Sequence, residues 1–137
     1  MTQGKDKELR ATGRCLCGAV AYEVRGKLRD AWNCHCGQCL RTHGNVAAYS
    51  AVKREDFTLT EERGLKWYDS SDFARRGFCQ VCGASLFWEA GKRDYIAVAA
   101  GSLDPPTGIK TRGHIFVAHK SDYYEITDDL EKYPDGH

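Results

Sequence analysis

The sequence predicts an all-β fold, a β-sandwich or tent of short antiparallel strands. Apolar residues recur with a period of two in several short segments, which is typical of half-buried strands. Glycine, aspartate, serine and proline residues separate these segments and indicate turns, as in residues 101–106. About eight or nine short strands with turns between them favour an all-β domain over a mixed fold.

The alternation is clearest in residues 19–24 and 46–52. In the first of these segments, Val20, Tyr22 and Val24 occupy every second position. The same reasoning predicts further strands at residues 57–60, 65–68, 86–88, 95–99, 114–118 and 123–126.

The length of 137 residues favours a single domain. We expect residues 1–11 to form a flexible N-terminal arm, residues 12–130 to form the domain, and residues 131–137 to form a C-terminal tail. Helix is expected only as short turns at residues 38–43 and 128–133.

Composition excludes several classes of partner. The net charge of +1 gives no basic excess, so nucleic acid is not expected as a partner. The longest apolar runs, such as residues 96–100, are too short to span a bilayer, so no membrane partner is expected. The N-terminal stretch lacks the apolar centre of a signal peptide, and together with reduced thiols this predicts a cytoplasmic protein. No oligomeric state follows from the sequence.

Seven cysteines in three tight clusters are the strongest functional signal. The clusters are Cys15-Leu16-Cys17, Cys34-His35-Cys36-Gly37-Gln38-Cys39 and Cys79-Gln80-Val81-Cys82. Cysteines one or two residues apart can place their sulfurs on one ion at about 2.3 Å, as zinc requires. The clusters therefore predict zinc binding.

Roles without a metal fit the cysteines less well. A disulfide framework would leave one of seven thiols unpaired, and neighbours as close as Cys15 and Cys17 make strained bridges. A thioredoxin-type pair at Cys79 and Cys82 would need a helix after it, whereas the following residues predict a strand. Inert burial accounts for single cysteines but not for three clusters.

The spacing favours two sites of unequal kind. The first and last clusters supply two sulfurs each, enough for a closed tetrahedral site, and each runs into a glycine, Gly18 or Gly83. The middle cluster supplies three sulfurs and leaves one position open, as catalytic zinc sites do. This division into four and three is the simplest one, and other pairings stay open at this stage.

With these clusters in place, the chain resembles the glutathione-dependent formaldehyde-activating enzyme family, also called the GFA or CENP-V/GFA domain family. The resemblance spans roughly residues 12–127, and each of the seven cysteines has a counterpart. The matching segments are Gly13–Val20, Cys34–Arg41, Gly77–Ala84, Ala100–Asp104 and His114–Val117.

The resemblance implies an Mss4-like β fold stapled by two zinc ions per chain. It implies that a structural zinc is held by Cys15, Cys17, Cys79 and Cys82. It implies that the zinc of the active site is held by Cys34, Cys36 and Cys39. The implied reaction joins formaldehyde to a small-molecule thiol such as glutathione, which is a carbon–sulfur lyase reaction in reverse.

An open three-cysteine zinc suits this chemistry, because metal coordination yields a thiolate near neutral pH. Two further functions are compatible with the sequence: a non-catalytic, zinc-stapled binding module, and a thiol carrier that binds without turnover.

The residues around the clusters also have expected roles. His35 points away from the metal, and Arg41 and His43 either meet an anionic substrate or lie on a solvated turn. Leu40 departs from the basic residue that the family often has there. Structural roles are expected for Arg75 and Arg76 at a strand edge, for His114, and for Trp32, Trp67 and Trp88 in the core.

Overall fold

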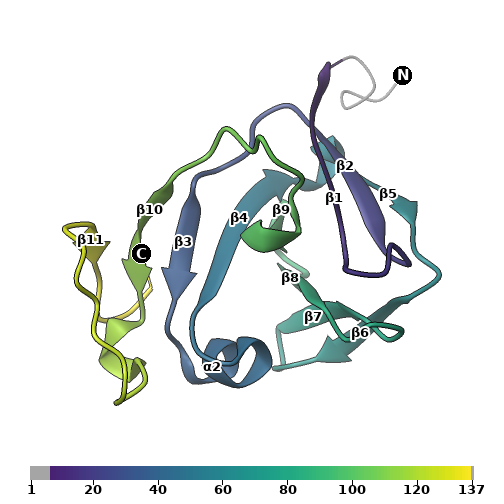
Figure 1. The fold of residues 1–137 in the computed structure, drawn as a ribbon. Helices are drawn as coiled ribbons and strands as arrows, with labels where there is room; N and C mark the ends of the chain where they lie inside the picture. Colours follow the sequence, from purple (N-terminus) through teal and green to yellow (C-terminus); the bar gives the residue numbers. More distant parts are fainter. Residues whose placement is uncertain (1–6, 137) are drawn as a thin grey trace.

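The computed structural model describes residues 7–136, and its strands form two sheets with a single α-helix among the described residues (Figure 1). The smaller sheet is antiparallel and has the order β1-β2-β5. Its strands are β1 (Leu9–Arg14), β2 (Ala21–Arg25) and β5 (Phe57–Glu61). The all-β prediction is confirmed.

The larger sheet has eight strands, and the helix α2 (Gly37–His43) lies between two of them in the chain. In spatial order the strands are β11 (Glu131–Lys132), β10 (Thr111–Ile115), β3 (Ala31–Cys34), β4 (Ala47–Lys53), β9 (Tyr95–Ala99), β8 (Ser85–Ala90), β7 (Ala74–Cys79) and β6 (Leu65–Asp69). Strand β10 pairs in parallel with both β3 and β11, so the expectation of antiparallel strands alone is wrong there.

The main core lies between the small sheet and the β6–β9 part of the large sheet. Tyr22, Phe57 and Phe87 form an aromatic triangle with ring centroids 5.4 Å apart on each side. Gly13, which pairs with Tyr22 across the sheet, leaves room for the tyrosine ring. Cys15 and Cys79 belong to the same buried cluster, so the core reaches the cysteines that join the two sheets.

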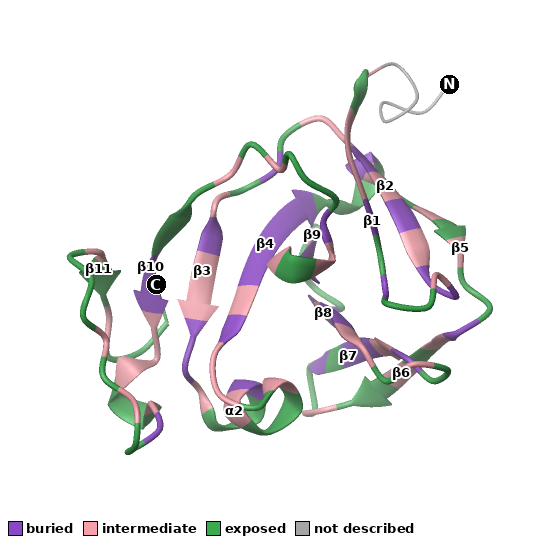
Figure 2. Cartoon of the chain, in the orientation of Figure 1, coloured by how far each residue is buried: buried purple, intermediate pink, exposed green. Residues whose placement is uncertain are grey.

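A second buried cluster lies under the helix. It contains Cys34, Cys39, Tyr49 and two alanines of β9, and Figure 2 shows β4 as mainly buried along its length. Strand β9 contributes the small side chains of Ala97 and Ala99 to this cluster, and helix α2 packs against the neighbouring strand β4. The middle cysteine cluster is therefore anchored in its own small core.

The period-two segments and one helix are predicted correctly. Strands β2, β4, β5, β6, β8 and β9 occupy the predicted segments within a few residues, and α2 occupies the helical turn predicted at residues 38–43. Strands β1, β3 and β7 have no counterpart among the predicted segments. Their sequences contain arginine, threonine, asparagine and glycine at positions where an alternating pattern would need apolar residues.

Three predictions for the C-terminal third are wrong. The strand expected at residues 114–118 begins at Thr111, ends at Ile115 and is followed by a short 3₁₀ turn. Residues 123–126 form no strand, and residues 128–133 contain the two-residue strand β11 in place of a helix. Pairing of β11 with β10 satisfies the backbone of this segment, and local propensity does not reveal such a pairing.

Both chain ends differ from the expected arm and tail where the structure describes them. Strand β1 begins at Leu9, so the last residues of the expected arm pair with β2; residues 1–6 lie outside the described part. The expected tail begins at Glu131, which pairs with Gly113. Among residues 7–136, no helix has the length and apolarity needed to cross a bilayer.

Candidate metal centres

Four cysteines from two distant segments come together between the sheets. They are Cys15, Cys17, Cys79 and Cys82, whose sulfurs all lie within 4.8 Å of one another. The Sγ atoms of Cys15 and Cys17 are 3.8 Å apart, and those of Cys17 and Cys79 are 3.7 Å apart. Four sulfurs at about 2.3 Å from a central zinc would be about 3.8 Å apart, so this group fits a tetrahedral zinc.

The backbone around this group points amides at the sulfurs. Gly18 and Gly83 both have left-handed backbone, with φ of +83° and +82°, so each cysteine pair is followed by a tight turn. The amide of Val20 donates to Cys15 Sγ at 3.3 Å, and the amide of Cys82 donates to Cys79 Sγ at 3.5 Å. Such donors stabilise thiolates, which are the form that binds zinc.

The other three cysteines lie where β3 meets α2. Cys34 ends the strand, Cys36 caps the helix, and Cys39 lies in its first turn; their sulfurs also lie within 4.8 Å of one another. Cys34 and Cys39 are buried, whereas Cys36 is half-buried. All seven cysteines are free thiols, and they form the two groups that the spacing favours.

The three sulfurs interact strongly with one another. The pKa of Cys36 is lowered because the thiols of Cys34 and Cys39 hydrogen-bond to its thiolate. The pKa of Cys34 is raised because its own hydrogen bonds to Cys36 and Cys39 stabilise the protonated form. Three thiolates in this volume need a cation between them, so the donor set fits a zinc with three protein ligands and a fourth position for another group.

A group of polar side chains lies beside these sulfurs, with Arg76 at its centre rather than at the expected strand edge. Arg76 is only 8% exposed, and its Nη2 donates to Cys39 Sγ at 3.7 Å. Its Nη1 donates to the hydroxyl of Tyr49 at 3.4 Å, and its Nε donates to Gln38 Oε1 at 3.2 Å. The same Tyr49 hydroxyl is 2.8 Å from His43 Nε2.

The protonation of this group follows from its burial. Burial raises the pKa of Tyr49 well above its usual value and lowers the pKa of His43. Both side chains are therefore neutral, and the tyrosine hydroxyl donates to the imidazole while accepting from Arg76. His43 is thus held by Tyr49, whereas Arg41, the other predicted substrate contact, is exposed on the helix.

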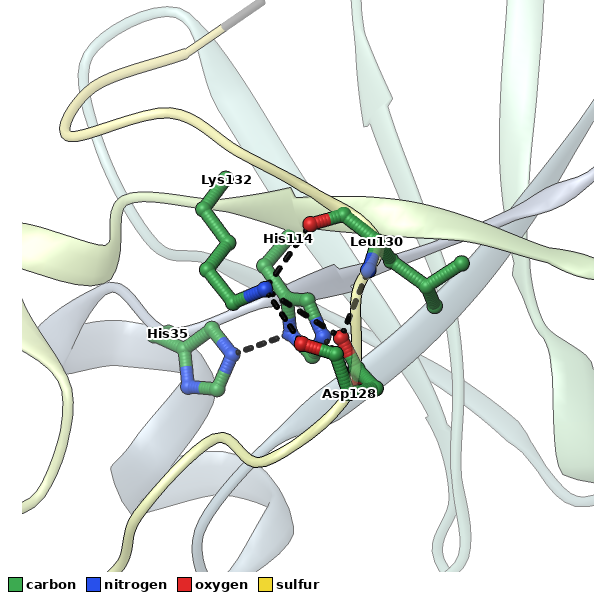
Figure 3. A network of polar contacts seen from close by, with 5 residues as sticks. All are labelled: His35, His114, Asp128, Leu130 and Lys132. Carbon is green, nitrogen blue, oxygen red and sulfur yellow. Dashed lines mark hydrogen bonds and ion pairs between the residues drawn. The ribbon is translucent and has the colours of Figure 1, made fainter.

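A second polar chain runs from the middle cluster toward the C-terminal segment (Figure 3). His35 is fully buried, and its Nε2 lies 2.9 Å from Nδ1 of His114; His114 Nε2 lies 2.9 Å from a carboxylate oxygen of Asp128. Burial lowers the pKa of His35, and the hydrogen bond from His114 lowers the pKa of Asp128. The carboxylate accepts from His114, so His114 accepts from His35 in turn.

The hydrogen bonds from His35 to His114 and from His114 to Asp128 account for the orientation predicted for His35. Its side chain is directed to β10 and the C-terminal segment, while Cys34 and Cys36 on either side of it supply the sulfurs. No sequence signal marks Asp128, since its role depends on a contact with a residue 14 positions away on another element.

Replacing His114 with alanine should therefore destabilise the domain. The change leaves His35 Nε2 buried without its partner, which costs about 1–3 kcal/mol of unfolding free energy. Denaturant unfolding of the zinc-loaded protein measures this loss. His119→Ala, at an exposed histidine, is the matched control and should change the unfolding free energy by less than about 0.5 kcal/mol; equal effects of the two substitutions would contradict the role of the chain.

Comparison with known proteins identifies relatives of this chain. Residues 10–119 match the family described as glutathione-dependent formaldehyde-activating enzyme. A protein of Schizosaccharomyces pombe named an uncharacterized lyase is 30% identical over 86 residues, which are 61% of this chain and 61% of that protein. The chain thus matches about three fifths of the length of this curated relative.

A solved structure is also similar. The crystal structure of a Rhodobacter sphaeroides protein shares 26% sequence identity with a TM-score of 0.58, and the match covers 75% of this chain and 98% of that one. This likeness agrees with the all-β, Mss4-like fold. Since the family match covers far more than half of the chain, the protein belongs to the glutathione-dependent formaldehyde-activating enzyme family.

Proposed function

We propose that the protein is a zinc-dependent carbon–sulfur lyase that acts on a thiol–aldehyde adduct of the S-hydroxymethylglutathione type. Cys34, Cys36 and Cys39 hold the zinc of the active site, and the four-cysteine group holds a structural zinc. The observation that carries the proposal is the group of three clustered sulfurs, with Cys36 half-buried, in a member of this family.

The reaction needs a thiolate and a proton. In the direction of synthesis, the thiolate sulfur forms a bond to the aldehyde carbon, and the aldehyde oxygen takes up the proton that the thiol has lost. The reverse reaction breaks the same carbon–sulfur bond. A zinc ion among three sulfurs supplies the positive charge that favours the thiolate form of an added thiol near neutral pH.

Residues of the chain contribute the remaining parts. Cys36 is the most exposed of the three sulfurs and so borders the side from which a substrate enters. Tyr49 keeps its proton because burial raises its pKa well above the usual value. Its hydroxyl, fixed between Arg76 and His43, forms a neutral, rigid wall of the site that does not compete with the substrate for the proton.

A cavity that is lined by Cys15 of the four-cysteine group, and by none of Cys34, Cys36 and Cys39, offers space for a peptide-like thiol. Its volume is about 540 Å³, within the usual range for small-molecule sites, and His43 lies at its wall. Arg14 and Asp104 bring opposite charges to the same cavity. Glutathione carries both carboxylate and ammonium groups, so its charges match those of the two residues.

Exchange spectroscopy tests the proposal directly. With ¹³C-formaldehyde and glutathione at equilibrium, NMR measures the rate at which S-hydroxymethylglutathione forms and breaks. We expect the zinc-loaded protein to increase this rate in proportion to its concentration, and Cys36→Ser to leave only the spontaneous rate. Thiol binding without faster exchange would identify a carrier, and absence of any thiol binding would identify a zinc-stapled binding module.

A further inference from the structure

Arg76 is a buried cation whose charge faces cysteine sulfur. Neighbouring residues of a strand point to opposite sides, and on β7 this separates two arginines. Arg75 lies over the Trp67 ring at 3.9 Å and pairs with Glu89, whereas Arg76 turns inward to the Cys39 sulfur. None of the ion pairs among residues 7–136 includes Arg76, so the sulfurs of the middle cluster are the negative groups in contact with it.

The guanidinium stays charged in this place. An arginine guanidinium keeps its proton in proteins, and this one is 8% exposed with its Nη2 3.7 Å from Cys39 Sγ. A buried cation destabilises the folded protein unless a nearby negative charge compensates it. The three sulfurs provide that charge only when they are thiolates, which is the form that binds zinc.

The charge balance gives Arg76 a function. Zn²⁺ with three thiolates has a net charge of −1, and a thiolate as fourth ligand would bring it to −2. A second negative charge is unfavourable in a poorly solvated site. When the positive charge of Arg76 is counted with the centre, the net charge is 0 with three thiolates and −1 with four. The binding of an anionic fourth ligand is therefore less unfavourable.

We propose that Arg76 is a positioning residue that tunes the three-cysteine centre to accept an anionic thiolate rather than a neutral ligand. This inference rests on the proposed function and adds the determinant of ligand charge to it. It also accounts for the hydrogen bonds of the Arg76 head group with Gln38 and Tyr49, since these contacts hold its Nη2 beside Cys39.

Cobalt-substituted protein provides the test, because a further thiolate on Co²⁺ increases the sulfur-to-cobalt charge-transfer absorption that the cysteines already give. The two probes are 2-mercaptoethanol, which binds as an anion and has no carboxylate, and imidazole, which binds neutral. We expect Arg76→Gln, which keeps hydrogen-bonding groups but loses the charge, to weaken thiolate binding on the order of 10- to 100-fold. Its imidazole affinity should change less than about threefold, since no ligand charge is involved.

Two variants complete the design. Arg76→Lys restores a positive charge and should recover most of the thiolate affinity, and Arg75→Gln, on the outer face of the same strand, should behave like the wild type. If Arg76→Gln does not fold, Arg76→Met replaces it as the neutral variant, with circular dichroism as the check on folding.

The two ways of failing are distinguishable. If the wild type binds 2-mercaptoethanol and the neutral Arg76 variant binds it equally well, or if both probes weaken to the same extent, the role of Arg76 is overturned while the proposed function stands. If the cobalt-loaded wild type binds no thiol at all, the proposed function fails and this inference fails with it.

Discussion

Replacing Cys82 with serine should remove zinc from the four-cysteine group and unfold the domain. Structural zinc contributes apparent binding free energies of about 10–16 kcal/mol, whereas a domain of this size has a net stability of about 5–15 kcal/mol. The group also joins distant parts of the chain, since Cys17 and Cys79 are 62 residues apart, and two of its members, Cys15 and Cys79, belong to the main core. Circular dichroism and zinc analysis of the purified protein measure both losses.

The contrast with the middle cluster makes this prediction specific. Closing a loop of 62 residues restrains the unfolded chain by about 2 kcal/mol more than closing the five-residue interval from Cys34 to Cys39. If Cys82→Ser kept a cooperative melt and two bound zinc ions, the structural role of this group would be contradicted.

Replacing Cys36 with serine should instead abolish thiol binding and leave the fold nearly intact. Cys36 caps helix α2, and its sulfur accepts a hydrogen bond from the Cys39 amide at 3.4 Å. Serine is one of the best residues at this position, so the helix keeps its cap. The zinc content should fall from about two ions to about one, because two sulfurs and a hydroxyl bind zinc poorly.

Thermal melting and calorimetry with glutathione check this second prediction. The melting temperature of Cys36→Ser should stay close to that of the wild type, and the heat of glutathione binding should vanish. Collapse as severe as that of Cys82→Ser would mean that the middle cluster is also needed for folding.

Local patterns account for what the sequence predicts well. The cysteine spacing, the glycines that follow it and the period-two strands are all visible within a few residues. Helix α2 is predicted from the same kind of local pattern. The two cysteine groups can be anticipated because each sulfur has a neighbour a few residues away at most.

The rest of the site depends on contacts between distant segments. Arg75 and Arg76 are adjacent and chemically identical, and only the register of β7 decides which one turns toward Cys39. His35 and His114 are 79 residues apart and meet because β10 pairs in parallel with β3. No local pattern indicates that pairing, and the sequence of β3 lacks the alternation that marks the predicted strands.

The central claim is that the chain has one closed sulfur site and one site that accepts a thiol. Cadmium-113 NMR of protein loaded with two Cd²⁺ ions tests it most directly, since each site gives its own resonance. We expect two signals, of which only one shifts when glutathione is added and only that one disappears in Cys36→Ser. If neither signal shifts when glutathione is added, or if both signals shift, the division into a structural and a thiol-binding site is contradicted.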